Sequence, residues 1–172
     1  MTVPDAYAIR RATAADAEEM ARVEAEARAI LRAHGVDLDA LRSTEAFEES
    51  LDWDLALVAE ADGRLVGLAR GSDLGDGFLA LDQVSVSPAH AGRGLGRQLL
   101  LELAAYARES GHRVITGTTF ASVPFNAPFY AGLDATEDPD PHPVMVSRRH
   151  VEQELGLDAL GPRVVMRLRL AG

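Results

Sequence analysis

A run of glycines and arginines at residues 91–97 is the part of the sequence best suited to bind an anion. It reads Ala-Gly-Arg-Gly-Leu-Gly-Arg and lies between a strand-like run and a strongly amphipathic helix pattern. The first N–H groups of a helix have no partners within the helix, and the helix dipole is positive there. Glycines let the backbone approach an anion closely, and Arg93 and Arg97 add positive charge. The segment therefore predicts a site for a diphosphate.

Other phosphate-binding loops fit this segment less well. A dinucleotide fold needs Gly-x-Gly-x-x-Gly and an acidic residue about 20 positions later. Here the pattern is Gly-x-Gly-x-Gly, and the following strand at 113–116 holds no acidic residue. No Lys-Ser or Lys-Thr pair follows the glycines, so the Walker pattern is absent. A glycine-rich turn that merely connects a strand to a helix stays open as the alternative.

Composition narrows the classes of function. The 172 residues suit one domain, 1–172, with a substantial core, and no repeat or linker divides them. A net charge of −10 disfavours nucleic-acid binding, which needs clustered Lys and Arg. The absence of cysteine excludes disulfides and a thiol nucleophile, and the five scattered histidines predict no metal site. No signal-peptide core or membrane-spanning run is found, so a cytoplasmic location and no membrane partner are expected.

Alternating apolar residues over short stretches predict six β-strands. Asp62-Gly63 is expected to form a tight turn between two of them, and the Gly- and Asp-rich segment 71–77 a second turn. Pro88 cannot continue a central strand and marks the end of one. The expected strands are residues 7–10, 55–60, 65–70, 78–86, 112–118 and 164–170.

Two stretches have the spacing of amphipathic helices. Thr13 is expected to cap the first near its start, while Gly35 and Gly111 mark helix ends. The two apolar stripes are Met20, Val23, Ala27 and Ile30, and Leu95, Leu99, Leu103 and Tyr106. Further helices are expected at 39–50, 127–131 and 147–155, with a loop at 134–143. This element order predicts an α/β sandwich, a mixed sheet with helices on both faces.

Two motifs occur in order along the chain. A strand ending Val84-Ser85-Val86 precedes the glycine-rich segment, and residues 126–133 read Asn-Ala-Pro-Phe-Tyr-Ala-Gly-Leu. With these motifs the chain resembles the GNAT superfamily of N-acetyltransferases over nearly its whole length. It departs from the family pattern at Ala91, which is usually Gln or Arg, and at Leu133, which is usually Phe.

The resemblance implies a mostly antiparallel mixed sheet whose strands 78–86 and 113–118 splay apart to admit acetyl-CoA. The pantetheine arm would pair with the backbone of Val84 and Val86, and one of their N–H groups would polarise the thioester carbonyl. Asn126 would contact the arm. The residues implied to hold the pyrophosphate are Gly92, Arg93, Gly94, Leu95, Gly96 and Arg97. No metal is implied.

Acyl transfer to an amine requires a base, an oxyanion stabiliser and a proton for the departing thiolate. Tyr130, placed by the second motif, is our candidate for the acid, with packing of its helix as the alternative. Asp82 is our candidate for the base, because strand alternation puts it on the face of Val84 and Val86 unless a bulge intervenes. A solvated Asp at a strand end is an equally weighted alternative.

The sequence is therefore interpreted as an acetyl-CoA-dependent N-acetyltransferase acting on a primary amine of a small molecule, peptide or protein by direct transfer. A non-catalytic acyl-CoA-binding or sensing module on the same fold is the alternative. It would bind coenzyme A without turnover. Family analogy alone also suggests a homodimer. The sequence holds no motif that specifies the acceptor.

Overall fold

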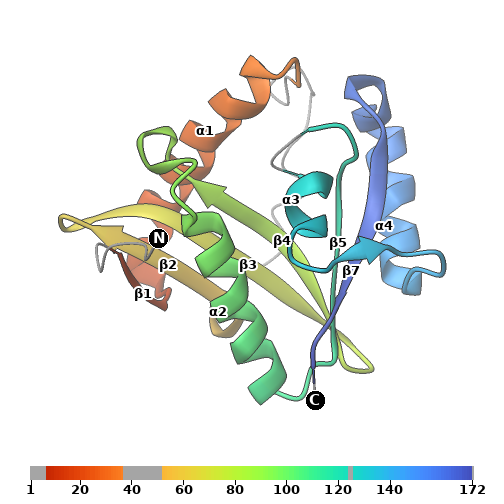
Figure 1. Ribbon diagram of the computed structural model, residues 1–172, viewed down its shortest axis with the longest axis horizontal. Helices are drawn as coiled ribbons and strands as arrows, with labels where there is room; N and C mark the ends of the chain where they lie inside the picture. The colour runs from red at the N-terminus through yellow and green to blue at the C-terminus, as the bar shows by residue number, and fades with distance from the viewer. Residues whose placement is uncertain (1–6, 37–51, 124–125, 172) are drawn as a thin grey trace.

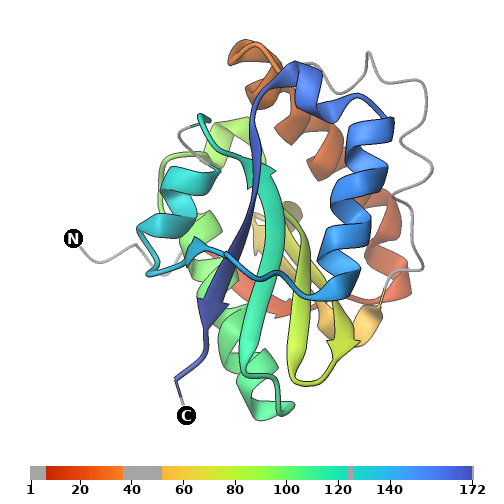
Figure 2. The same cartoon turned by 90° about the vertical axis from the view of Figure 1, so that its right-hand side faces the viewer.

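The computed structural model describes residues 7–36, 52–123 and 126–171, and it forms one seven-stranded sheet with helices on both faces (Figures 1 and 2). The strand order is β1-β2-β3-β4-β5-β7-β6. Only β4 and β5 pair in parallel, while every other neighbouring pair is antiparallel. The strands are β1 (Ala8–Arg11), β2 (Ala56–Ala61), β3 (Arg64–Gly75), β4 (Phe78–Val86), β5 (Val114–Phe120), β6 (Thr136–Glu137) and β7 (Arg163–Arg169).

The described part of the chain forms four α-helices around the sheet: α1 (Ala17–Ala33), α2 (Leu95–Glu109), α3 (Ala127–Ala131) and α4 (Pro143–Glu154). Alternation along β2 separates the two faces, since Leu57 packs with α2 whereas Val58 packs with α1. Similarly, Leu79 of β4 joins the α2 core and Ala80 packs against Met145 of α4. Helix α2 therefore covers one face, and α1 and α4 cover the other.

The predicted α/β sandwich is confirmed, but several element boundaries were wrong. The segment 71–77 is not a turn, because β3 runs to Gly75 and pairs with β4, leaving a reversal around Asp76. The last helix begins at Pro143 rather than 147, since His142 accepts the N–H of Val144 through Nδ1 and proline suits a first helical position. The expected loop 134–143 contains the short β6. The helix expected at 39–50 lies outside the described residues.

In the part of the chain that the structure describes, no helix has both the length and the apolar character required to cross a bilayer.

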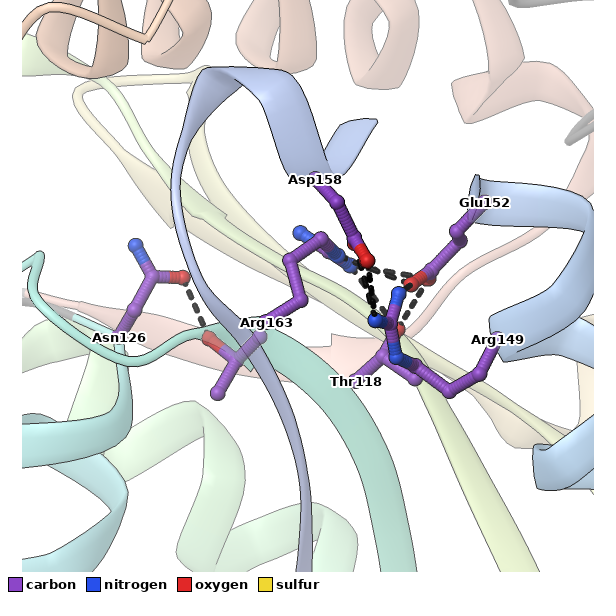
Figure 3. Close-up of polar contacts among 7 residues, drawn as sticks. Thr118, Asn126, Arg149, Glu152, Asp158 and Arg163 are labelled. Carbon is purple, nitrogen blue, oxygen red and sulfur yellow. Dashed lines mark hydrogen bonds and ion pairs between the residues drawn. The ribbon is translucent and has the colours of Figure 1, made fainter. Parts of the chain in front are cut away.

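A buried ion-pair network ties α4 to the sheet beside β5 (Figure 3). The Glu152 side chain is 3% exposed, and Arg163 of β7 donates to both of its oxygens at 2.9 Å. Arg149 donates a hydrogen bond of 2.7 Å to Glu152, and its Nη2 also donates to both carboxylate oxygens of Asp158. The hydroxyl of Thr118 on β5 also donates to Glu152. Three elements thus meet at one carboxylate, which fixes α4 over the sheet.

The neighbours of Glu152 stabilise the ionised form of its carboxyl group. Burial alone would raise the pKa of its carboxyl, but the hydrogen bonds and charge of Arg163, with help from Thr118 and Arg149, bring that pKa below its usual range. The folded state therefore binds the proton less readily than the unfolded chain. The resulting stabilisation is present above the pKa of an unfolded Glu, about 4.3, and is lost as the pH falls through the lower folded value.

We predict that Glu152→Gln lowers the free energy of unfolding by about 3 kcal/mol at pH 7, because it leaves the buried guanidinium of Arg163 without its counter-charge. Urea denaturation at pH 7 and pH 4 measures this. The variant should also lose less stability than wild type on acidification. Glu154→Gln, on the exposed side of the same helix, is the control and should stay within about 0.5 kcal/mol. Equal effects of the two substitutions would contradict the role assigned to the network.

Candidate functional site

Strands β4 and β5 part partway along their length. Their parallel pairing extends from Phe78 opposite Val114 to Ala80 opposite Thr116 and stops there, although β4 continues to Val86. At the point of divergence Gly117 has no room to spare, since a Cβ there would lie 3.2 Å from the Leu81 carbonyl oxygen. The predicted splay of the sheet is thus confirmed, and it leaves the β5-facing edge of β4 beyond Ala80 without a partner strand among the described residues.

A cavity of about 1130 Å³ opens at this gap. Its walls come from α1, β3, β4, β5, β7, the start of α2, α3 and α4. Because α2 lies on one face of the sheet and α1 and α4 lie on the other, the cavity passes between the strands and reaches both faces. This volume suits a ligand at least as large as a drug-sized molecule. Two reactants can therefore approach the gap from opposite sides.

The backbone of Val84 and Val86 faces the gap. The N–H of Ser87 donates to the Val66 carbonyl oxygen on β3 at 2.8 Å. Because the bonding direction alternates along a strand, Ser85 also bonds toward β3, and the peptide groups of Val84 and Val86 point away from it. Both valines line the cavity. A ligand that lies in the gap can pair with these groups as an added strand would.

The glycine-rich segment presents a row of free amides at the start of α2. Gly92 and Gly94 have φ values of +73° and +82°, a left-handed conformation that glycine adopts without strain. The helix begins at Leu95, and its first internal bond runs from the Gln98 N–H to the Gly94 carbonyl oxygen at 3.0 Å. None of the N–H groups of residues 92–97 donates to an acceptor in the described ranges. These amides and the helix dipole form a seat for an anion.

The side chains of this segment contribute unequally. Gly92, Gly94, Leu95, Gly96 and Arg97 line the cavity. Arg97 also donates to the Gly132 carbonyl oxygen at 3.2 Å, which connects α2 to the end of α3. Arg93, in contrast, is exposed and is not among the cavity-lining residues. The backbone therefore offers more direct contacts for an anion than the two arginines do.

His90 lies beside this segment, at the end of a short 3-10 helix that follows β4. It lines the cavity, and its Nδ1 is 3.0 Å from the Tyr7 hydroxyl on the N-terminal side of β1. It stands next to Ala91, the position at which the chain departs from the family pattern. The imidazole of His90 thus supplies a polar side chain beside Ala91, which itself has none.

Asn126 and Tyr130 bring polar groups to the cavity from α3. Asn126 Oδ1 accepts a hydrogen bond of 2.7 Å from the Thr119 hydroxyl, whereas its Nδ2 is buried with no partner among the described residues. An orphaned buried donor is costly, so a ligand oxygen is expected to pair with it. Burial raises the pKa of Tyr130 to about 12, so its phenol stays protonated throughout the neutral range.

Asp82 does not lie where strand alternation predicted. A bulge sets Arg70 opposite Gln83 but Gly71 opposite Leu81, so Asp82 is the extra residue. Its carboxylate points to the α4 side, where it accepts from Ser72 and, at 2.6 Å, from Arg148. Val84 and Val86 pack on the α2 side instead. The predicted shared face was wrong, and the bulge is the cause.

Sequence reasoning missed the residues that form the α1 and α4 side of the cavity. Arg70 ends the predicted third strand and pairs with Glu24 of α1, and Gln83 lies opposite it on β4. Arg148 reaches Asp82 across 66 positions. No local motif marks these residues, because their proximity results from the bulge and from the packing of α1 and α4. Three or more His, Asp or Glu side chains do not cluster as metal ligands anywhere in the described ranges.

The chain matches the model of the Acetyltransferase (GNAT) family over residues 20–133. Among solved structures, N-acetylglutamate synthase from Neisseria gonorrhoeae, complexed with coenzyme A and N-acetyl-glutamate, is similar with a TM-score of 0.70 and 21% identity. The match covers 96% of this chain and 35% of that one, so this chain spans about a third of its length. These values support the fold.

Two further solved structures are similar over almost their entire lengths. The ribosomal-protein-S18-alanine N-acetyltransferase from Escherichia coli has a TM-score of 0.65 at 17% identity, and the match covers 96% of this chain and 95% of that one. The PaiA N-acetyltransferase from Thermoplasma acidophilum, in complex with coenzyme A, has a TM-score of 0.65 at 18% identity, with 95% and 98% covered.

We predict that Gly94→Asp weakens coenzyme A binding at least about 10-fold, because a carboxylate at the start of α2 occupies the anion seat and repels phosphate. Aspartate tolerates the left-handed conformation better than most residues, so the fold should persist. Gly63→Asp, at φ +76° with open space around it, is the matched control. Calorimetric titration measures both affinities, and an unchanged Kd for Gly94→Asp would argue against phosphate binding at this helix start.

Proposed function

Since the chain belongs to the acetyltransferase (GNAT) family, and is thereby an acyltransferase, we propose that it moves an acetyl group from acetyl-CoA directly to a primary amine. One observation carries the proposal: the free amides at the start of α2 lie at one end of the gap between β4 and β5. A ligand with a diphosphate at one end and an extended amide-bearing arm at the other matches this arrangement. Coenzyme A has that construction.

In this proposal the N–H groups of residues 92–97 bind the pyrophosphate. The peptide groups of Val84 and Val86 pair with the amides of the pantetheine arm, and the orphaned Nδ2 of Asn126 donates to one of its oxygens. The arm then occupies the unpaired edge of β4. A backbone N–H of this edge also donates to the thioester carbonyl oxygen, where negative charge develops during attack.

The chemistry follows from these positions. The neutral amine attacks the thioester carbonyl carbon, an N–C bond forms, one N–H proton leaves, and the C–S bond breaks. A thiol has an ordinary pKa of about 8.5 and is a stronger acid than a phenol, so full transfer of the Tyr130 proton to sulfur is uphill. We therefore propose that Tyr130 acts as the acid mainly by donating a hydrogen bond to the departing thiolate. Its pKa of about 12 keeps that hydrogen available at neutral pH.

Asp82 remains our candidate for the base. The acceptor amine would reach it from the α4 side of the sheet. Its placement on the α4 side supports this, because the amine must approach from the face opposite α2. The carboxylate already accepts bonds from Ser72 and Arg148, so a proton that arrives at Asp82 displaces one of them. We propose transfer through an ordered water rather than direct contact.

The acceptor is an amine of a small molecule or a peptide. Among the similar structures, one is complexed with N-acetyl-glutamate and another is named for the alanine of a ribosomal protein. N-acetyl-glutamate carries an acetylated nitrogen next to a carboxylate, and the alanine is an amino-acid residue of a protein. A homodimer and a cytoplasmic location stay predictions, which light scattering and fractionation can check.

The function is tested with a library of amines, acetyl-CoA and a thiol-detecting reagent. Release of free coenzyme A that depends on an added amine, with the acetylated amine found by mass spectrometry, supports the proposal. Tight binding of coenzyme A without turnover across the library would replace the enzyme with a sensing module.

We predict that Tyr130→Phe lowers kcat by about 10²-fold, since it removes the hydrogen-bond donor to the leaving thiolate and leaves the ring packing intact. The KM for acetyl-CoA should change little. Tyr106→Phe, which alters a tyrosine packed against the α2 core, is the control and should keep full activity. Unchanged turnover in Tyr130→Phe would remove the acid assignment while leaving the enzyme class in place.

We predict that Asp82→Asn lowers kcat by about 10²-fold and that the loss shrinks at high pH, where more of the amine is already neutral. Asparagine keeps the size of the side chain and a hydrogen-bond acceptor for Arg148. Asp73→Asn, on the exposed part of β3, is the control. A pH-independent loss would assign Asp82 a positioning role toward Arg148 instead of proton transfer.

A further inference from the structure

The cavity is lined by more arginines than carboxylates, although the protein as a whole is acidic. Three carboxylates and six arginines line it, whereas the whole chain has 27 acidic and 17 basic residues. The carboxylates are Glu24, Asp82 and Glu152, and the arginines are Arg28, Arg70, Arg97, Arg148, Arg163 and Arg167. Because an acidic protein concentrates arginine here, the positive lining points to an anionic ligand. Arg97 belongs to the glycine-rich segment, and Arg163 and Arg167 are held by the buried carboxylates of Glu152 and Asp138. On the side of β3 and β4, Arg70 is the arginine whose role needs its own explanation.

All three carboxylates are already engaged by arginine. Arg70 binds Glu24 at 3.1 Å, Arg148 binds Asp82 at 2.6 Å, and Arg163 binds Glu152 at 2.9 Å. A second ammonium group on the acceptor, such as a polyamine would carry, therefore finds no carboxylate that is free of a cation. The acceptor side disfavours a polycation.

Arg70 has donors to spare. Its Nε donates to Glu24 Oε1, but its two terminal nitrogens have no hydrogen-bond partner within residues 7–36, 52–123 and 126–171. Its side chain is 19% exposed and lines the cavity. The planar edge of a guanidinium matches a carboxylate in two parallel hydrogen bonds. Arg70 can therefore bind a carboxylate without giving up its bond to Glu24.

The sheet places Arg70 close to the proposed reaction point. It is paired with Gln83, the residue directly before Val84, and strand partners have Cα atoms only about 5 Å apart. Gln83 also lines the cavity and donates its Nε2 hydrogen to Ser85 Oγ at 2.7 Å, which leaves its Oε1 as an acceptor. The terminal nitrogens of Arg70, which can donate to a carboxylate, and Gln83 Oε1, which can accept from an amine, therefore lie side by side next to Val84.

We propose that the acceptor is an amine that carries a carboxylate, as an amino acid does, and that Arg70 determines this specificity. The inference rests on the proposed function and names its substrate class. Arg70 binds the carboxylate through its terminal nitrogens, and Gln83 Oε1 accepts a hydrogen from the amine beside the thioester. A peptide N-terminus, which has no carboxylate next to its amine, and a polyamine are poorer ligands.

The test uses matched acceptors, the free amino acids and their C-terminal amides, with acetyl-CoA and a thiol-detecting readout. We expect kcat/KM to favour the free acids at least 10-fold. Arg70→Gln should raise KM at least 10-fold for the acids and leave the amides nearly unchanged. Arg64→Gln is the matched control, since Arg64 lies on the same strand with a side chain that is 66% exposed. Equal use of acids and amides by the wild-type protein would overturn the inference and leave the proposed function intact.

A binding measurement distinguishes a wrong substrate class from a wrong proposed function. The protein is saturated with coenzyme A and titrated calorimetrically with the same acids and amides, so no turnover is needed. We expect the acids to bind and Arg70→Gln to abolish that binding. Glu24→Gln, which releases the Nε of Arg70, should tighten binding of the acids, an effect that loss of folding cannot mimic. If none of the acids binds, or if Arg70→Gln leaves their affinity unchanged, the substrate class is wrong; binding without turnover would instead remove the enzyme and keep the site.

Discussion

The structure depends on backbone hydrogen-bonding groups that the fold leaves without partners at two adjoining places. Within the described residues, the amides at the start of α2 have no acceptor, and beyond Ala80 the edge of β4 that faces β5 has no paired strand. Val84, Val86 and Gly96 are half-buried, where unpaired peptide groups are costly, whereas Gly92, Gly94 and Arg97 are exposed and can exchange water for a ligand. Such groups gathered around one cavity suit it to bind a ligand. The orphaned Nδ2 of Asn126 adds a third such donor on the same wall.

The rest of the molecule holds this gap open. Helix α2 is anchored by fully buried leucines, Leu99 and Leu103, so its first turn is fixed relative to β4. On the opposite face, the Glu152 network fixes α4 beside β5 and β7 (Figure 3). Gly117 brings β5 against Leu81 where the strands separate. Rigid supports on both faces let the strands part without collapsing onto each other.

Much of the cofactor side could be predicted from the sequence, whereas the acceptor side could not. Residues 91–97 form a turn and the first residues of α2, so the glycines and the start of an amphipathic helix specify them directly. Asp82 shows the limit: a one-residue bulge, which no local pattern announces, moved it to the other face. Arg70 and Arg148 enter the cavity through the packing of α1 and α4 on the sheet. Such contacts between distant segments carry no spacing signal.

Amide NMR can locate the backbone groups that bind coenzyme A. Isotope-labelled protein is titrated with coenzyme A while the N–H resonances are followed. We expect the largest shifts on residues 92–97, with Val84 and Val86 next. Saturation with coenzyme A that leaves these amides unmoved, or that moves a surface away from the gap between β4 and β5, would contradict it.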